Sequence, residues 1–120
     1  MLIKHTEDCN EFTANDGCRI RELLHPANDR DTELPFSVAL ARVAPGKHSY
    51  DHYLEQVEVY YIISGRGVMH IDDETAEVGP GDSVYIPALA RQWIENPGPE
   101  ELVFTAIVSP PWTEQGDIRL

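Results

Sequence analysis

The sequence predicts a single all-β domain. Three observations support that prediction: the chain length, the composition and the regular spacing of turn residues. Its 120 residues fit one domain near the commonest domain size. Nine prolines and eight glycines favour many turns and few long helices. From Pro45 onward, turn residues recur at strand-sized intervals that leave no room for an amphipathic helix of about ten residues. Short strands at this spacing are typical of a sandwich or a barrel.

The first third of the chain is the least regular part of this domain. Residues 1–16 show no sustained period and predict an N-terminal arm with at most one short strand. Residues 17–24 have strand-like content. Residues 25–35 concentrate Pro, Asn and Asp, and they predict a surface loop.

Three segments further along predict strands because they are rich in β-branched and aromatic residues between turn signals: 36–43, 57–63 and 101–108. The Gly-Arg-Gly sequence at 65–67 is expected to be a hairpin turn. Residues 109–120 contain a Pro-Pro pair that cannot continue a central strand, so this tail is expected to fold over the barrel or onto a neighbour.

Charge narrows the classes of partner. Lys and Arg total 9 against 21 Asp and Glu, so the formal net charge is −12. Such a surface repels phosphate backbones and anionic lipids, and we expect neither nucleic acid nor a membrane as partner. Neutral or cationic small molecules are favoured unless Lys47 or Arg91 supplies local positive charge. Without a signal-like segment or an apolar run of membrane-spanning length, the protein is expected to be cytoplasmic.

Candidate site residues lie just before the Gly-Arg-Gly turn. His52 and Glu58 are six residues apart, so both side chains can face the same side if the strand register continues between them. His48 and Tyr50 share the parity of His52. Imidazole and carboxylate suit Mn, Fe, Ni, Co or Zn ions. A solvated histidine at a strand edge is the ordinary alternative.

Two ordered sets of residues match a known pair of motifs. The first motif reads Gly, five residues, His, one residue, His, three or four residues, Glu, six residues, Gly. Gly46, His52, Glu58 and Gly65 fall at these spacings, and Leu54 stands where the second histidine belongs.

The second motif reads Gly, five residues, Pro, one residue, Gly, two residues, His, three residues, Asn. Gly81, Pro87 and Asn96 match it, whereas Leu89 replaces the glycine and Gln92 replaces the histidine.

With these motifs the chain resembles a small single-domain cupin of the type-2 family, and the resemblance covers a core from about residue 36 to residue 108. It implies a jelly-roll barrel of two antiparallel sheets, built as one domain over residues 1–120. The polar side chains of the two motifs would line the mouth of this barrel.

The resemblance also implies a metal site, because in such cupins two His and a Glu of the first motif and a His of the second hold a divalent ion. His52 and Glu58 would be the retained ligands. Gln92 would contribute a weaker amide oxygen, and His48 or Tyr50 would have to swing in as a further donor. The expected ion is Mn, Fe, Ni, Co or Zn, held weakly.

A metal-free pocket is the alternative. His52 and Glu58 would then pair inside the barrel, with Gln92 donating to Glu58 and offering its carbonyl to a ligand. Tyr60 shares the parity of Glu58, and its expected role is core packing with a satisfied hydroxyl. Glu58 and Tyr60 are the candidate catalytic residues of this pocket.

Tyr61 and Val59 have the opposite parity from Glu58, and Trp93 has the opposite parity from Gln92. Outward aromatic residues on so small a barrel would form an exposed apolar patch, and we therefore expect a homodimer.

These observations leave two functions open. One is an enzyme whose weakly held metal ion acts on a small oxygen-bearing substrate, of the isomerase or epimerase, decarboxylase or dioxygenase type. The other is a metal-free small-molecule binding or sensing module without catalytic activity, which Leu54 favours. A purely structural dimer has the least support.

Overall fold

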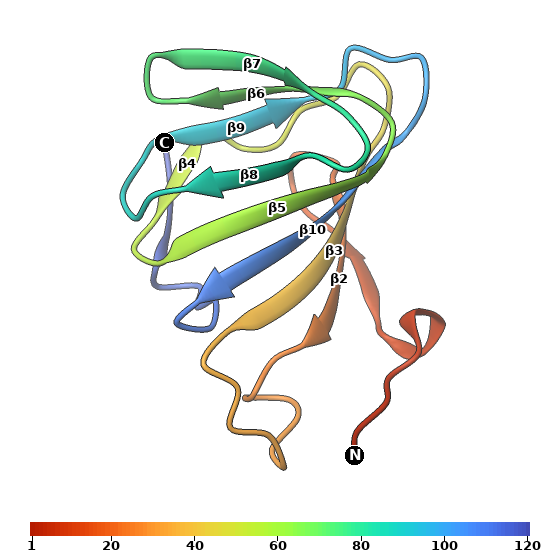
Figure 1. Cartoon of the computed structure of the whole chain (residues 1–120), viewed down its shortest axis with the longest axis vertical. Helices are drawn as coiled ribbons and strands as arrows, with labels where there is room; N and C mark the ends of the chain where they lie inside the picture. The colour runs from red at the N-terminus through yellow and green to blue at the C-terminus, as the bar shows by residue number, and fades with distance from the viewer.

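The computed structural model describes all 120 residues and consists of two antiparallel β-sheets that curve around one apolar core (Figure 1). The predicted all-β jelly-roll fold is confirmed. The only helical segment is the 3-10 turn η1, Thr6–Asp8. The strands are β1 Glu11–Thr13, β2 Arg19–Leu24, β3 Ser37–Val43, β4 His52–Leu54, β5 Val57–Ser64, β6 Gly67–Ile71, β7 Glu74–Val78, β8 Ser83–Ile86, β9 Gln92–Glu95, β10 Leu102–Ser109 and β11 Asp117–Arg119.

The larger sheet has the strand order β1-β2-β3-β10-β5-β8, and the smaller one has the order β11-β4-β9-β6-β7. The three strand predictions made from β-branched and aromatic content are confirmed to within one residue at each end. They correspond to β3, β10 and β5, which lie side by side in the middle of the larger sheet. Residues 25–35 form the predicted loop, with no strand in it.

The prediction of a hairpin at residues 65–67 is wrong. β5 pairs with β10 and β8 in the larger sheet, whereas β6 pairs with β7 and β9 in the smaller one, so this turn carries the chain from one sheet to the other. Gly65 has a φ of 79°, and a Cβ atom there would collide with the backbone carbonyl of Glu101. Only glycine fits at this position of the turn between the two sheets.

Other motif glycines also occupy turns with positive φ. Gly46 and Gly81 have φ values of 79° and 88°. Leu89, which stands where the second motif has its glycine, retains a φ of 68°. This is the left-handed region that glycine adopts without strain, so the backbone conformation of Leu89 is one that favours glycine.

The C-terminal tail folds over its own barrel. β11 extends the smaller sheet by pairing with β4, in a register that sets Asp117 opposite Leu54 and Arg119 opposite His52. Earlier in the tail, the Trp112 backbone N–H donates to Ser37 Oγ across 3.0 Å. The tail thereby contributes to the wall of the barrel interior.

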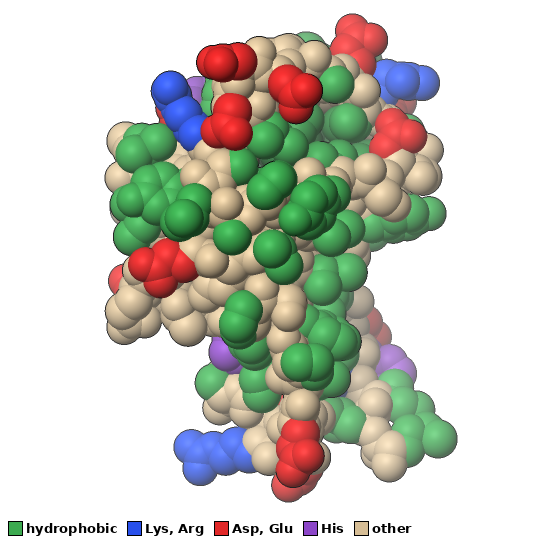
Figure 2. All heavy atoms as spheres, turned by 60° about the vertical axis from the view of Figure 1, so that its left-hand side comes forward, with side chains coloured by type: hydrophobic (Ala, Val, Ile, Leu, Met, Phe, Trp, Pro, Cys, Tyr) green, Lys and Arg blue, Asp and Glu red, His purple; other side chains and the backbone are tan.

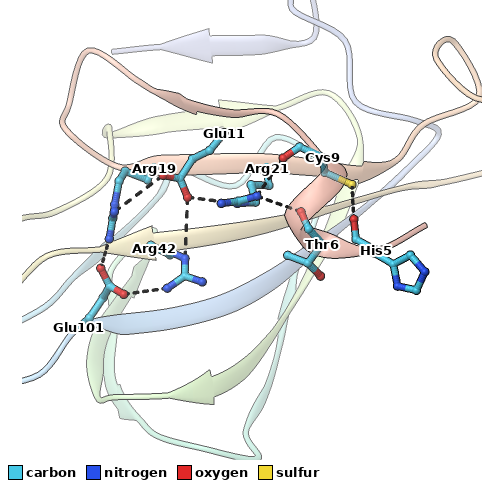
Figure 3. A network of polar contacts seen from close by, with 8 residues as sticks. All are labelled: His5, Thr6, Cys9, Glu11, Arg19, Arg21, Arg42 and Glu101. Carbon is cyan, nitrogen blue, oxygen red and sulfur yellow. Dashed lines mark hydrogen bonds and ion pairs between the residues drawn. The ribbon is translucent and has the colours of Figure 1, made fainter.

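The arm at the N-terminus is fixed to the outside of the larger sheet by an ionic network (Figure 3). Arg21 donates to the backbone carbonyls of Thr6 and Cys9 at 2.9 and 3.0 Å. Arg42 forms an ion pair with Glu101 at 3.0 Å. Because these side chains are partly exposed, each pair contributes little stability alone, and the network mainly sets the position of the arm.

The core lies between the sheets and is formed by apolar side chains from both of them. Val43, Ile62, Ile94 and Leu102 are fully buried there. Figure 2 shows further hydrophobic side chains across the middle of one face of the molecule, with several acidic side chains at its upper and lower ends. The structure contains no helix with the length and apolar character that a membrane span needs.

The outward aromatic residues do not form the single patch that the sequence suggested. Tyr61 and Val59 lie on β5 in the larger sheet, but Trp93 lies on β9 in the smaller one. The Trp93 ring stacks on His70 with a centroid separation of 3.7 Å, and the His48 ring contacts it edge-on at 5.6 Å. Trp93 is thus covered by its own chain.

Candidate functional site

The barrel encloses a cavity of about 200 Å³ whose wall combines both sheets, the arm and the tail. Hydrophobic side chains make up most of this wall, and the polar groups of the first motif, His52 and Glu58, are part of it. A hollow of about 260 Å³ elsewhere on the surface offers only Arg66 and Glu100 as charged groups. The cavity inside the barrel is therefore the candidate site.

Glu58 is the central polar group of this cavity. It lies on β5 between β10 and β8, and the strand alternation turns its side chain inward, leaving it 6% exposed. Burial raises the pKa of the Glu58 carboxyl from 4.5 to about 7. A hydrogen bond from Gln92 opposes this rise in pKa, and the negative charge of Asp117 adds to it.

Gln92 forms hydrogen bonds with both candidate catalytic residues, Glu58 and Tyr60. It is fully buried on β9, and its amide nitrogen donates to Glu58 Oε1 across 2.9 Å. The Tyr60 hydroxyl donates to the Gln92 amide oxygen across 3.1 Å. The Gln92 carbonyl, expected to face a ligand in the metal-free alternative, instead accepts from Tyr60, and Gln92 is not among the residues that line the cavity. Burial is the main cause that holds the pKa of Tyr60 well above its usual value.

His52 begins β4 and lines the cavity. Its Nδ1 lies 2.7 Å from the Tyr50 backbone carbonyl, which only accepts hydrogen bonds. We therefore assign the proton of the neutral ring to Nδ1, which leaves Nε2 with a free lone pair. His52 is in this way oriented as a hydrogen-bond acceptor.

His48 is not brought to the cavity. It is exposed, donates from Nδ1 to the Ser49 carbonyl across 2.9 Å, and rests against Trp93 on the smaller sheet. Tyr50, the alternative further donor, does line the cavity, and the Arg119 guanidinium lies 3.9 Å from the centre of its ring.

The residues present do not fit a first-row metal ion. The Gln92 oxygen accepts from Tyr60, Leu54 has no donor atom, and His48 lies outside the cavity. The structure places no group of three or more His, Cys, Asp or Glu side chains where they could share a metal ion. His52, Glu58 and Tyr50 are the members of the expected set that line the cavity. Tyrosine is not a usual ligand of these ions, and the two remaining donors do not define a metal centre.

The motifs gave no indication of the other ionisable groups in the cavity wall. Asp117 and Arg119 reach it from β11, and Asp16 and Glu22 reach it from the N-terminal third. The Trp112 indole N–H donates to Asp117 Oδ2 across 3.1 Å, while Asp117 Oδ1 is buried without a hydrogen-bond partner. One sequence feature bears on the groups from β11: the Pro-Pro pair in residues 109–120, from which we expect the tail to fold over the barrel.

Comparison with known proteins places this geometry in a family. The family model described as "Cupin domain" matches residues 39–108. The chain is 36% identical over 104 residues to the uncharacterised protein MJ1618 of Methanocaldococcus jannaschii, covering 87% of this chain and 82% of that one.

Solved structures agree with this assignment. A Cupin 2 conserved barrel domain protein from Salinispora arenicola is 25% identical with a TM-score of 0.75, covering 96% of this chain and 91% of the other. The polyketide cyclase RemF from Streptomyces resistomycificus has a TM-score of 0.82 at 18% identity, covering 100% of this chain and 85% of its own. The likeness to RemF concerns the fold alone.

Proposed function

Because this chain belongs to the cupin family and encloses a cavity around a buried glutamate, we propose that it binds a small organic molecule there without a metal ion. We propose further that Glu58 transfers a proton to or from that molecule. The proposal combines two expectations from the sequence. It takes the metal-free pocket from one hypothesis and the small oxygen-bearing substrate from the other.

The observation that carries the proposal is the state of Glu58. With a pKa of about 7, this carboxyl is present in both protonation states near neutral pH. A general acid or base is most effective when its pKa lies near the working pH. The cavity gives a ligand access to this group, and the Gln92 amide fixes the orientation of one of its oxygens.

The neighbouring residues support the same chemistry. A substrate hydroxyl would donate to His52 Nε2, the free nitrogen of that ring. Tyr60 does not compete for the substrate, because its hydroxyl holds Gln92, and its proposed role is that of a positioning residue. In proton transfer of the isomerase or epimerase type, Glu58 would be the group that removes the proton and returns it.

The test has two steps. Small oxygen-bearing compounds that bind are first identified because they raise the melting temperature of the protein, and these ligands are then tested for exchange of their hydrogen with solvent deuterium. Wild-type protein in D2O should introduce deuterium into such a ligand, detected by proton NMR, and Glu58→Gln should lose at least 90% of the rate. Glu55→Gln, an exposed neighbour, serves as the matched control and should retain the rate. Ligands that bind without exchange would overturn the catalytic proposal and favour a binding module.

The metal-free part of the proposal has its own test, at His52 and Glu58. Elemental analysis of purified, untagged protein beside His52→Ala should find no stoichiometric metal in either. Near-stoichiometric metal that is lost in His52→Ala would overturn the metal-free proposal.

A further inference from the structure

We propose that the ligand of this cavity carries a protonated amine, and that Asp117 on the C-terminal strand, together with Glu58, binds it. This inference rests on the proposed function, because it concerns the same cavity, and it adds the chemical class of the ligand and a second binding residue. Neither cupin motif contains Asp117.

The charges that line the cavity are unbalanced. Four acidic residues contribute to its wall, and Arg119 is the only Lys or Arg among the lining residues. The Arg119 guanidinium lies over the Tyr50 ring, 3.9 Å from its centre. The lining acidic residues are Asp16, Glu22, Glu58 and Asp117.

Two of these four carboxyl groups hold other segments of the chain in place. Asp16 accepts hydrogen bonds from the backbone N–H groups of Cys18 and Tyr50, at 2.9 and 2.8 Å. Glu22 accepts from the side-chain amide of Asn28. These contacts hold the arm and the loop in place and leave little for a ligand to satisfy.

Glu58 and Asp117 are incompletely satisfied. Glu58 accepts only from the neutral amide of Gln92, and Asp117 accepts only from the indole of Trp112. Asp117 Oδ1 is buried and has no hydrogen-bond partner. No ion pair of the structure includes either residue. Carboxylates removed from water without a cationic partner are costly, and a cation bound beside them offsets that cost.

The two carboxyl groups belong to the wall of the same cavity. The charge of Asp117 is one of the causes that raise the pKa of Glu58. An ammonium group has three hydrogen-bond donors and no acceptor, so it complements acceptors such as Glu58, Asp117 and His52 Nε2. The net charge of −12 attracts such a ligand and repels an anionic one.

The rest of the wall defines the body of the ligand. Side chains on β3 and β10 form an apolar surface, among them Val43, Phe104 and Val108. Together with a volume of about 200 Å³, this surface fits a compact aromatic or branched aliphatic group. The ligand class is therefore a small oxygen-bearing primary amine with an apolar body.

Three probes of similar shape test the charge preference: benzylamine, benzyl alcohol and benzoate. Each is titrated into uniformly labelled protein at pH 8 with a chelator present, and amide shifts of the cavity residues are followed by NMR. Benzylamine should bind at least tenfold more tightly than benzyl alcohol, and benzoate should not bind.

Variants test the residue assignment. Asp117→Asn keeps an oxygen that can accept from Trp112, so the tail should stay in place; it should weaken benzylamine binding at least tenfold and leave benzyl alcohol unchanged. Glu114→Gln, an exposed charge on the same tail, is the matched control and should change neither. Glu58→Gln should also reduce the preference for benzylamine over benzyl alcohol. If Asp117→Asn does not fold, this second variant still tests whether the cavity carboxyl groups bind the amine.

The outcomes separate this inference from the proposed function. Equal binding of benzylamine and benzyl alcohol in the cavity would overturn the amine proposal while the ligand-binding cavity stands. A benzylamine preference that survives in both variants would overturn the assignment to Asp117 and Glu58. If none of the probes shifts the cavity residues, the ligand-binding proposal fails as well.

Discussion

The Gln92 amide nitrogen lies 2.9 Å from Glu58 Oε1, and it donates a hydrogen bond to that carboxyl. The second cupin motif has its histidine at the position of Gln92, so a donor to Glu58 stands where the resemblance implied a metal ligand. In this orientation the amide oxygen accepts from the Tyr60 hydroxyl, so both polar atoms of the Gln92 side chain have partners within the chain. The pair therefore favours a site organised around a carboxyl proton.

Stability should fall with rising pH because of Glu58. Its pKa is about 7 in the folded protein against an ordinary value of 4.5, so between these values the folded state binds more protons than the unfolded state, and the free energy of unfolding decreases as pH rises. The two pKa values correspond to roughly 3 kcal/mol in total, about 2 kcal/mol of which is lost between pH 5.5 and 8. Urea unfolding of wild type and Glu58→Gln at several pH values measures this difference.

Glu55→Gln removes an exposed carboxyl from the same region and should follow the wild-type profile. Other groups titrate equally in all three proteins, so the difference between wild type and Glu58→Gln isolates one residue. Parallel profiles for these two proteins would show that Glu58 titrates in its ordinary range.

The fold could be predicted from the sequence because the residue patterns that indicate strands and turns are local. Turn residues at regular spacing and the β-branched content of 36–43, 57–63 and 101–108 determine strands one at a time. Alternation along β5 also placed Glu58 and Tyr60 on the inner face. Parity within a strand does not tell which strands share a sheet, and for this reason parity alone predicts one patch for Trp93 and Tyr61 although Trp93 lies on the other sheet.

The site was harder to predict, because parity carries information only where a strand is continuous. His48 forms an isolated bridge with Glu95, and β4 begins only at His52, so the shared parity of the two histidines does not put them in one place. Asp117 comes from a strand at the far end of the chain. No spacing within a motif could report it.

Gly65→Ala should be far more destabilising than an ordinary glycine replacement. The new methyl group would meet the backbone of Glu101 and Leu102, which cannot move without disturbing β10, and the positive φ adds strain. We expect a loss of more than about 3 kcal/mol. Gly81→Ala is the control, because its φ is also positive but its Cβ would meet nothing within 4 Å; it should cost about 1 kcal/mol. Equal losses in urea unfolding would refute the steric argument.

The predicted homodimer should form through the outer face of the larger sheet. Val57, Tyr61 and Ile63 on β5 are exposed there, and Tyr85 on the adjacent edge strand β8 is 63% exposed. A contiguous apolar surface of this kind is uncommon on a monomer and is buried when two copies pack against each other. Light scattering at about 10 μM should give twice the chain mass of 13.5 kDa.

Replacing Ile63 and Tyr85 together by Lys should give a monomer, because two charges per chain would have to be desolvated in the interface. The control is Leu89→Lys, which adds one charge at an exposed leucine in the loop between β8 and β9 and should leave the dimer intact. A wild-type monomer would refute the dimer itself. A dimer that survives the double replacement would place the interface elsewhere and leave the apolar face of β5 and β8 without its proposed partner.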